Sequence, residues 1–333
     1  MTTQVLPYSA ISPSEWDRFI TESPQGNVFA FYGYLQIIAP NWQAIILSEG
    51  EKWAAVMPLS KQKKMGFTFA LQPILAQHLG IFLQNISYKN DYEAFSSYRK
   101  IVLTLLENLP KTHVFLYHFS PTFPYSIPFR QAGYELRTRF TYHLRLDKTE
   151  NELWQNLASP LQRQIKKTQK QTFFLRNSQR EDIAALIAIF RQNQDTGKNL
   201  TGLASKNFEV TLAKLAKIAH YFLQEKKGIL LTLTDTEGQV QAGGIFGLCA
   251  QKMTYIAGGV SPEFRAEGLM SRLLWEAILL GKNNNCLLFD FEGSMIAGIE
   301  TFFRKFGAFP VPYLQIVHNQ LPFYIRWISA FKF

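Results

Sequence analysis

The sequence predicts an α/β (α+β) protein of two domains, each with a mostly antiparallel sheet flanked by helices. The chain has 333 residues, of which 47% are apolar, enough for two cores of ordinary size. Segments of helical and of strand periodicity follow one another along both halves. Their order is similar in the two halves, with helices first, then several strands and one helix set among the strands.

The elements of the first half follow from periodicity and from the residues that end each segment. Asn90 and the acidic residues after it are typical of a helix start, and Pro110 ends that helix. Strands are predicted where apolar residues alternate or run together between turn residues. The expected helices are 14–22 and 92–109, and the expected strands are 42–47, 53–59, 113–119 and 138–146.

The second half begins with helices and continues mainly with strands. A break at Ser159 and Pro160 separates its first helix from a basic one. The expected helices are 150–157, 160–171, 181–192, 208–223, one that begins near Arg265, and 296–306; the expected strands are 228–233, 240–249, 253–257, 287–291 and 309–317. No repeat is visible by residue identity, so the similarity of the halves rests on the order of their elements.

Composition and charge indicate where the protein is expected to be located and which kinds of partner it favours. The N-terminal residues lack a basic segment followed by an apolar run, and no run of about eighteen uncharged apolar residues occurs, so we expect a cytoplasmic protein without a transmembrane segment. Cys249 and Cys286 lie in apolar runs without a nearby Cys or His, which favours reduced core residues and no metal site. The net charge of +10 favours an anionic partner or serves solubility alone.

The stretch 255–307 carries most of the functional signal. After the strand 253–257, Gly258 and Gly259 lead into a turn and then into the helix expected near Arg265 and Gly268. The unpaired backbone N–H groups and the dipole of a helix start favour an anion there. A pyrophosphate or a carboxylate fits this turn, although Arg265 fits a solvated position in a first helical turn equally well.

Two carboxylates accompany the end of the strand 287–291. Glu292 lies just past it, where a half-buried carboxylate can take a proton from an attacking amine. Asp290 shares its strand face, so one of the two is expected to be the base and the other to position it. Two roles stay open for Glu292, which is either catalytic or part of the turn at Gly293. Two roles also stay open for Ser294, which is either a proton donor or a helix cap.

The basic helix presents like charges on one side. Arg163, Lys166, Lys167 and Lys170 are spaced i, i+3, i+4 and i+7 and therefore form one face, called here the basic face. A substrate phosphate, an RNA backbone or an acidic peptide explains this clustering. A solvated helix surface, or pairing with nearby glutamates, explains it as well.

Three segments resemble a known family. They are NWQAII…AVMPLSKQKKMGFTFALQP…QHLGIF in the first half, SPLQRQIKKTQK at the basic helix, and FDFEGSMIAGIETFFRKFGAFPVPY near the C-terminus. These segments resemble the FemAB-like branch of the GNAT superfamily, particularly its BioF2-like acetyltransferase domain proteins. The resemblance implies two tandem GNAT-like acyltransferase domains, 1–147 and 148–318, with the acyl-transfer site in the second. It also implies that residues 319–333 form a helix that packs back on the N-terminal domain rather than a membrane anchor.

The resemblance gives roles to the turn after residue 257. Arg265 and Gly268 fit the spacing R-x-x-G-x-[GA] with which GNAT enzymes hold the pyrophosphate of coenzyme A, although Met270 stands at the last position. Backbone N–H groups of the strand that carries Gly258 and Gly259 are expected to polarise the acyl carbonyl.

Further substrate contacts are implied elsewhere. Gln72, Gln77 and His78 match the family segment Q-P-x-x-x-Q-x-L-G-x-F and are expected to orient the substrate between the domains, with a core role as the alternative for His78. The related tRNA-dependent transferases have a lysine where this chain has Phe303. Arg304, also a candidate substrate contact, faces about 100° away from that position and cannot simply replace the lysine.

The expected function is an N-acyltransferase that moves an acyl group from a thioester, with acyl-CoA as co-substrate and without a metal, to a primary amine of a small molecule or peptide. One alternative is aminoacyl-tRNA-dependent transfer to a peptidoglycan precursor. A second alternative is a non-catalytic anion-binding protein. Neither a transmembrane segment nor a peripheral membrane contact is expected.

Overall fold

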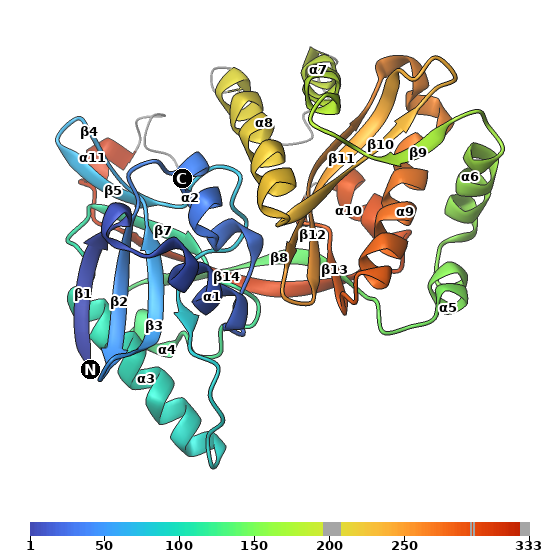
Figure 1. Ribbon diagram of the computed structural model, residues 1–333. Coiled ribbons are helices and arrows are strands. Elements are labelled where there is room, and N and C mark those ends of the chain that lie inside the picture. Colours follow the sequence, from blue (N-terminus) through green and yellow to red (C-terminus); the bar gives the residue numbers. More distant parts are fainter. Residues whose placement is uncertain (196–207, 294, 296, 327–333) are drawn as a thin grey trace. The chain divides into compact units, whose positions relative to one another are not determined.

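The structure, a computed structural model, describes residues 1–195, 208–293, 295 and 297–326 (Figure 1). It divides into two compact units. Unit 1 comprises Met1–Arg139 and Pro312–Phe333, and unit 2 comprises Phe140–Val311. The chain passes from one unit to the other within strand β8 (Glu135–Arg145) and again within strand β14 (Phe309–Asn319).

Unit 1 contains two sets of paired strands with helices around them. Its other elements are β1 (Thr2–Pro7), α1 (Pro13–Glu22), α2 (Tyr32–Ile38), β2 (Gln43–Glu49), β3 (Lys52–Leu59), β4 (Lys61–Lys64), β5 (Phe67–Leu71), β6 (Phe82–Leu83), α3 (Asp91–Asn108), β7 (Val114–His118), α4 (Ile127–Gln131) and α11 (Phe323–Arg326). The strand orders are β1–β2–β3–β6 and β4–β5–β7–β14.

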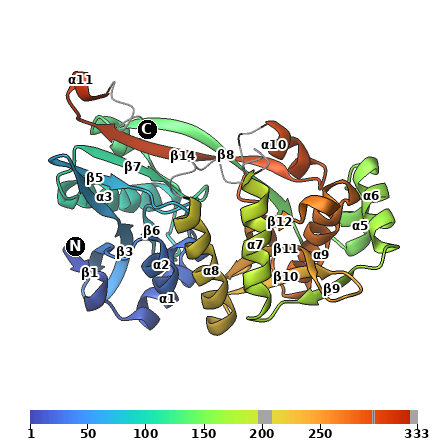
Figure 2. The ribbon, with the colours of Figure 1, turned by 90° about the horizontal axis from the view of Figure 1, so that it is seen from above.

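Unit 2 is built on one sheet with the order β8–β13–β12–β11–β10–β9. Its elements are α5 (Glu150–Gln155), α6 (Ser159–Gln169), β9 (Phe174–Asn177), α7 (Asp182–Asp195), α8 (Phe208–Glu225), β10 (Gly228–Thr234), β11 (Val240–Cys249), β12 (Lys252–Val260), the 3₁₀ helix η4 (Pro262–Glu267), α9 (Leu269–Asn283), β13 (Leu288–Asp290) and α10 (Ala297–Arg304). Helices α7 and α9 cover opposite faces of this sheet, since the adjacent residues Gly259 and Gly258 face them in turn (Figure 2).

The predicted fold class is confirmed, and the two repeats exchange their last strands. Apart from strands β4 and β5 in the first repeat and helices α5 and α6 in the second, each repeat has the order strand, two helices, two antiparallel strands, a third strand, a helix, a strand, a helix and a final strand. Strand β8 ends the first repeat but pairs with β13 in unit 2, and β14 ends the second repeat but pairs with β7 in unit 1. The predicted boundaries at residues 147 and 318 stay a prediction. The compact units divide the chain within β8 and within β14.

The structure bears on two predicted helices, the C-terminal one and the one expected near Arg265. After β14 the chain stays in unit 1, where Leu321 and Ile325 pack with Phe69 of β5; residues 327–333 of the predicted terminal helix lie outside the described residues. The helix expected near Arg265 begins only at Leu269. Gly268, with φ of 80°, ends the 3₁₀ helix η4 and separates it from α9.

The core of unit 2 is centred on α9. Residues of its buried side, such as Leu273 and Ile278, pack with Phe246 of β11 and Phe289 of β13. Cys249 and Cys286 are buried thiols. Within the described ranges, no helix combines the length and the apolar character needed to cross a membrane.

Candidate active site in unit 2

Strands β12 and β13 run parallel but pair over only three residues. The pairing joins Lys252–Thr254 to Leu288–Asp290. Beyond it the chain turns toward β8, where the Phe291 N–H donates to the Tyr142 carbonyl at 2.9 Å. In β12 itself, Ile256 is an extra residue in the pairing with β11 and forms a β-bulge. The two strands therefore separate just where β12 is bulged, and backbone groups of β12 there face no strand partner among the described residues.

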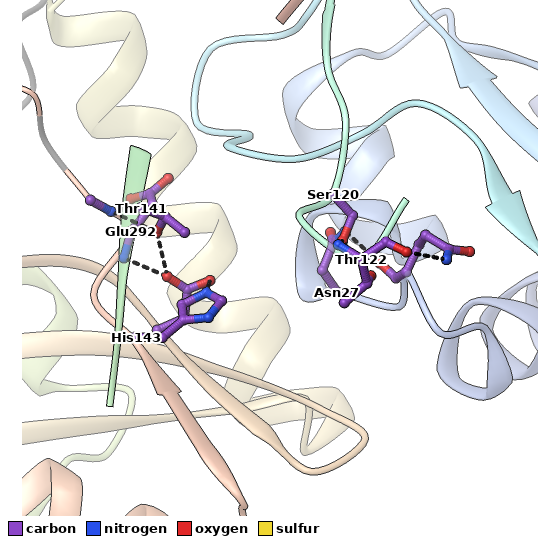
Figure 3. Close-up of polar contacts among 9 residues, drawn as sticks. Asn27, Ser120, Thr122, Thr141, His143 and Glu292 are labelled. Carbon is purple, nitrogen blue, oxygen red and sulfur yellow. Dashed lines mark hydrogen bonds and ion pairs between the residues drawn. The ribbon is translucent and has the colours of Figure 1, made fainter. Parts of the chain in front are cut away.

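Asp290 ties this opening to β8. Its side chain is 1% exposed. Thr141 Oγ1 donates to Asp290 Oδ1 at 2.8 Å, and the backbone N–H of Glu292 donates to the same oxygen at 3.0 Å (Figure 3). His143 Nε2 lies 3.4 Å from Asp290 Oδ2, and Thr141 Oγ1 accepts a bond from the Gly293 N–H at 3.1 Å. The carboxylate thus joins β8, β13 and the turn that follows.

The turn holds Glu292 in an uncommon backbone conformation. Its φ is 51°, in the left-handed region that glycine and asparagine usually occupy. The next residue must be glycine, because a Cβ on Gly293 would lie 2.6 Å from Thr141 Cα. The hydrogen bonds to Asp290 and Thr141 hold this strained turn against β8.

Burial gives Glu292 an unusual proton affinity. Its side chain is only partly exposed, and burial, followed by the negative charge of Asp290, raises the pKa of its carboxyl well above the ordinary 4.5. Unlike Asp290, the Glu292 carboxyl has no hydrogen-bond donor among the described residues. Burial, and then the charge of Glu292, also raise the pKa of Tyr255, the first residue of β12 beyond the paired segment. A carboxyl in this state can exchange a proton with a bound amine.

Side chains occupy the space beside the glycines that were predicted to contact the donor. A Cβ on Gly258 would lie 2.8 Å from Met270 Cε, and a Cβ on Gly259 would lie 2.7 Å from Asn193 Nδ2 of α7. Arg265, in η4, donates from Nη2 to Asn193 Oδ1. The structure therefore brings Gly259, Asn193 and Arg265 together, and Met270 fills the space over Gly258.

Helix α6 covers the turn at Gly268. A Cβ there would lie 2.3 Å from Gln164 Cγ, so glycine is required both by this contact and by its φ. The Gln164 side chain also accepts from Ser271 Oγ at 2.8 Å. Thr168 Oγ1 donates to the Glu267 carbonyl at 2.8 Å. The helix that carries the basic face is thus packed on the turn predicted to bind the donor. This contact was not predicted from the sequence.

The basic face is exposed as its spacing predicts. Its members are Arg163, Lys166, Lys167 and Lys170. Lys167 Nζ lies 3.1 Å from Glu267 Oε2, and Lys166 Nζ lies 5.5 Å from the centre of the Trp154 ring. Arg163 and Lys170 have no carboxylate partner in the part of the chain that the structure describes. An anion-binding role of this face stays a prediction.

Gln72 holds a loop of unit 1. Its Nε2 donates to the carbonyls of Ala76 and Gln77 at 2.8 and 2.7 Å, and its Oε1 accepts from the His118 N–H at 2.7 Å. Its amide group therefore joins the loop after β5 to β7. The structure accounts for this residue by folding, whereas a contact with substrate stays a prediction.

The rings of two histidines, His78 and His118, lie beside Tyr313 in unit 1. The buried rings of His78 and Tyr313 lie 4.5 Å apart. The buried Gln77 amide has no hydrogen-bond partner among the described residues. His118 was not predicted; burial, followed by the charge of Arg139, lowers its pKa to about 4. His118 is therefore neutral near pH 7.

The polar contacts at the start of unit 1 are structural. Ser120 and Thr122 hydroxyls lie 2.9 Å apart, and Thr122 Oγ1 donates to the Pro24 carbonyl at 2.8 Å (Figure 3). Asn27 Nδ2 donates to the Gln25 carbonyl at 3.1 Å. The bond from Thr122 to Pro24 fastens the loop between α1 and α2 to the segment after β7.

The remaining predicted residues lie around α10. Phe303 is 4% exposed, and its ring lies 4.9 Å from that of Phe291 in the core, so an apolar residue fits this position. Arg304 Nη1 lies 3.2 Å from Glu300 Oε1. Ser294 lies outside the described residues.

Sequence reasoning missed Thr141 and His143, which reach Asp290 from β8. Both are buried polar residues two positions apart in a strand that was predicted to be half-exposed. Polar residues repeated at this spacing within an apolar strand are the signal that could have identified them.

Comparisons with known proteins support the fold. No protein-family model matches the sequence, and no curated protein matches it. FemX is similar in structure, with a TM-score of 0.71, 12% identity and coverage of 94% of this chain and 97% of FemX. L-PGS from Bacillus licheniformis has a TM-score of 0.58, 12% identity and 96% coverage of both chains. A tandem GNAT protein from the clavulanic acid biosynthesis pathway has a TM-score of 0.51, 10% identity and coverage of 96% and 99%.

At these identities the likeness is one of fold. The chain has the tandem GNAT-type fold, and its resemblance to the FemAB-like branch is confirmed at that level. The opening between β12 and β13 lies in its second repeat.

Replacement of Gln72 tests its structural role. Gln72→Ala leaves the His118 N–H and two carbonyls without their partner, so the free energy of unfolding should fall by about 1–3 kcal/mol. Urea denaturation measures this, with Gln62→Ala on the exposed strand β4 as a control that should change it by less than about 0.5 kcal/mol. Unchanged stability of Gln72→Ala would contradict the assignment.

The raised pKa of Glu292 predicts a pH-dependent stability. Between pH 4.5 and its folded pKa, the folded state holds a proton that the unfolded state has lost, so this group makes stability fall as pH rises. Glu292→Gln removes that fall. Urea midpoints measured from pH 4 to 9 should show the variant gaining stability relative to the wild type as pH increases. Parallel curves at all pH values would mean that the carboxyl has an ordinary pKa.

Proposed function

We propose that the chain transfers an acyl or aminoacyl group from an activated donor to an amine. The site is the opening between β12 and β13. The observation that supports this most directly is the half-buried carboxyl of Glu292, with its raised pKa, beside the bulge of β12. Donor carbonyls need hydrogen-bond donors, and attacking amines need a base, and both kinds of group are present at this point.

The reaction uses groups already described. The amine nitrogen bonds to the acyl carbon, and its proton passes to Glu292 directly or through water. Backbone N–H groups of β12 near Ile256 stabilise the negative charge on the carbonyl oxygen. The bond from the acyl carbon to the leaving sulfur of a thioester, or to the leaving oxygen of an ester, then breaks. Tyr255, like any tyrosine, is protonated at neutral pH, and it donates its proton to the leaving group. Glu292, whose charge acts on Tyr255, then returns the amine proton to the tyrosine oxygen.

Acyl-CoA is the first donor we propose. Arg265 and the start of α9 supply a cation and free helix N–H groups for its pyrophosphate. The lack of a conflicting charge supports this, because Arg265 bonds only to the neutral Asn193 amide among the described residues. Met270 and Gln164 must then move aside, since they fill the space over Gly258 and Gly268.

Aminoacyl-tRNA is the second donor. Two observations favour it: the space that coenzyme A would need is occupied by Met270 and Gln164, and Arg163 and Lys170 of the basic face have no carboxylate partner in the described ranges. A phosphodiester backbone would satisfy such a face. Phe303 in the core, in place of the lysine, weighs against the chemistry of the related tRNA-dependent transferases.

Loss of the base should lower turnover. Glu292→Gln keeps the size of the side chain but cannot take a proton, so kcat should fall by roughly 10²–10⁴-fold with little change in donor affinity. A discontinuous assay with a panel of amines and the preferred donor measures this, with Glu300→Gln on α10 as a matched control that should retain turnover. Full activity of Glu292→Gln would remove the proposed mechanism.

Donor identity is decided by binding. If acyl-CoA is the donor, Arg265→Ala should weaken it by about 1.5–3 kcal/mol in calorimetry, and Met270→Ala should strengthen it by opening the space over Gly258. If aminoacyl-tRNA is the donor, its affinity should fall steeply with salt and with Arg163→Gln and Lys170→Gln combined. Binding of neither donor would favour a non-catalytic anion-binding protein.

A further inference from the structure

The β4–β5 hairpin is an addition to the repeated fold. It lies between β3 and β6 of unit 1, whereas in unit 2 the corresponding strands β11 and β12 follow each other directly. Strand β4 is at the end of its strand order, and all four of its residues are exposed. Three of them are Lys61, Lys63 and Lys64. The second repeat has the same fold without such a hairpin. The fold alone therefore does not explain why the hairpin is present in the first repeat.

Its tip carries a large apolar residue in a strained position. Lys64 pairs with Phe67, so Met65 and Gly66 form a two-residue turn, with φ of 49° and 80°. Such a turn favours Asn followed by Gly, and methionine in the left-handed region is unfavourable. Met65 is nevertheless 71% exposed. Neither packing nor turn geometry accounts for methionine here.

A second exposed apolar residue lies on an element that packs with this hairpin. Phe67 and Leu71 of β5 and Ile325 of α11 pack against one cluster, which contains Phe69 and Leu321. Phe323, at the start of α11, is 76% exposed. Two highly exposed apolar side chains and three lysines therefore belong to elements held by the same small core.

A partner should use both the lysines and the exposed apolar side chains. Lysines on an edge strand prevent pairing between sheets, but this does not explain Met65. An RNA backbone or an acidic protein surface would engage the lysines and leave the apolar tip in water. An anionic lipid surface takes apolar side chains into the boundary between headgroups and acyl chains, and it binds lysines at the headgroups.

We propose that the β4–β5 hairpin docks the protein on anionic lipid bilayers. Met65 enters the boundary region, Lys61, Lys63 and Lys64 contact the anionic headgroups, and Phe323 adds a second apolar contact. This differs from the sequence-based expectation of no peripheral membrane contact. The docking is independent of the transfer reaction and of its donor.

Vesicle sedimentation tests the proposal with the full chain. Phosphatidylcholine vesicles with and without 30% phosphatidylglycerol are compared at about 0.1 M salt. Binding should require phosphatidylglycerol and should weaken as salt increases. The combined Lys61→Gln, Lys63→Gln and Lys64→Gln variant should bind on the order of 100-fold more weakly, about fivefold for each charge. Met65→Asn suits the turn better, so it should fold well and still bind roughly threefold to tenfold more weakly.

A matched variant separates the hairpin from net charge. Lys89→Gln, Lys148→Gln and Lys226→Gln remove the same charge from other exposed positions and should change binding less than about fivefold. Equal losses in both triple variants would show attraction by net charge alone and overturn the proposal. Full vesicle binding by Met65→Asn, or no vesicle binding by the wild type, would also overturn the proposal. If the wild type binds unstructured RNA but no vesicles, and the hairpin variant loses that RNA binding, the proposal is overturned as well.

Discussion

The hydrogen bond between Thr141 and Asp290 is the contact on which the candidate site depends. It joins the exchanged strand β8 to β13 at the point where β13 leaves β12. A carboxylate as buried as Asp290 is costly unless hydrogen bonds compensate it, and β8 and the turn supply them. Because β8 ends the first repeat, the site in the second repeat needs residues from both. The candidate site therefore depends on the pairing of the exchanged strand β8 with β13.

The same contact sets the properties of Glu292. Asp290 accepts the backbone N–H that holds Glu292 at a positive φ, and its charge helps to raise the Glu292 pKa. Both effects cost stability, one through backbone strain and one through burial of a carboxyl without donors. Such costs are typical of residues that are kept for chemistry rather than for folding. The satisfied Asp290 and the unsatisfied Glu292 thus divide the structural and the chemical roles between them.

Local patterns in the sequence were enough for most elements and for the two carboxylates. Glu292 follows a short apolar strand and precedes Gly293, and the spacing of Arg163, Lys166, Lys167 and Lys170 placed them on one exposed face. Strand β4 was missed because KQKK has no apolar periodicity, and its pairing with β5 alone makes it a strand. The late start of α9 was missed because the conformation of Gly268 depends on contact with Gln164.

Contacts between distant segments were beyond the sequence. The exchange of β8 and β14 leaves each strand's own periodicity unchanged, so nothing local distinguishes it from an unexchanged repeat. The packing of Met270 over Gly258, and of Asn193 beside Gly259, likewise depends on how α9 and α7 cover the sheet. These contacts decide how a donor enters, which is why the donor stays a proposal while the fold is established.

The most direct test of the account is an NMR titration of the glutamate carboxyl groups. Protein labelled with ¹³C at the glutamate side-chain carboxyl carbon is titrated from pH 3 to 9, and the Glu292 signal is assigned by its absence in Glu292→Gln. We expect one glutamate that titrates well above 4.5, apart from the others, because of burial and the Asp290 charge. A Glu292 signal that titrates together with the exposed glutamates would contradict it.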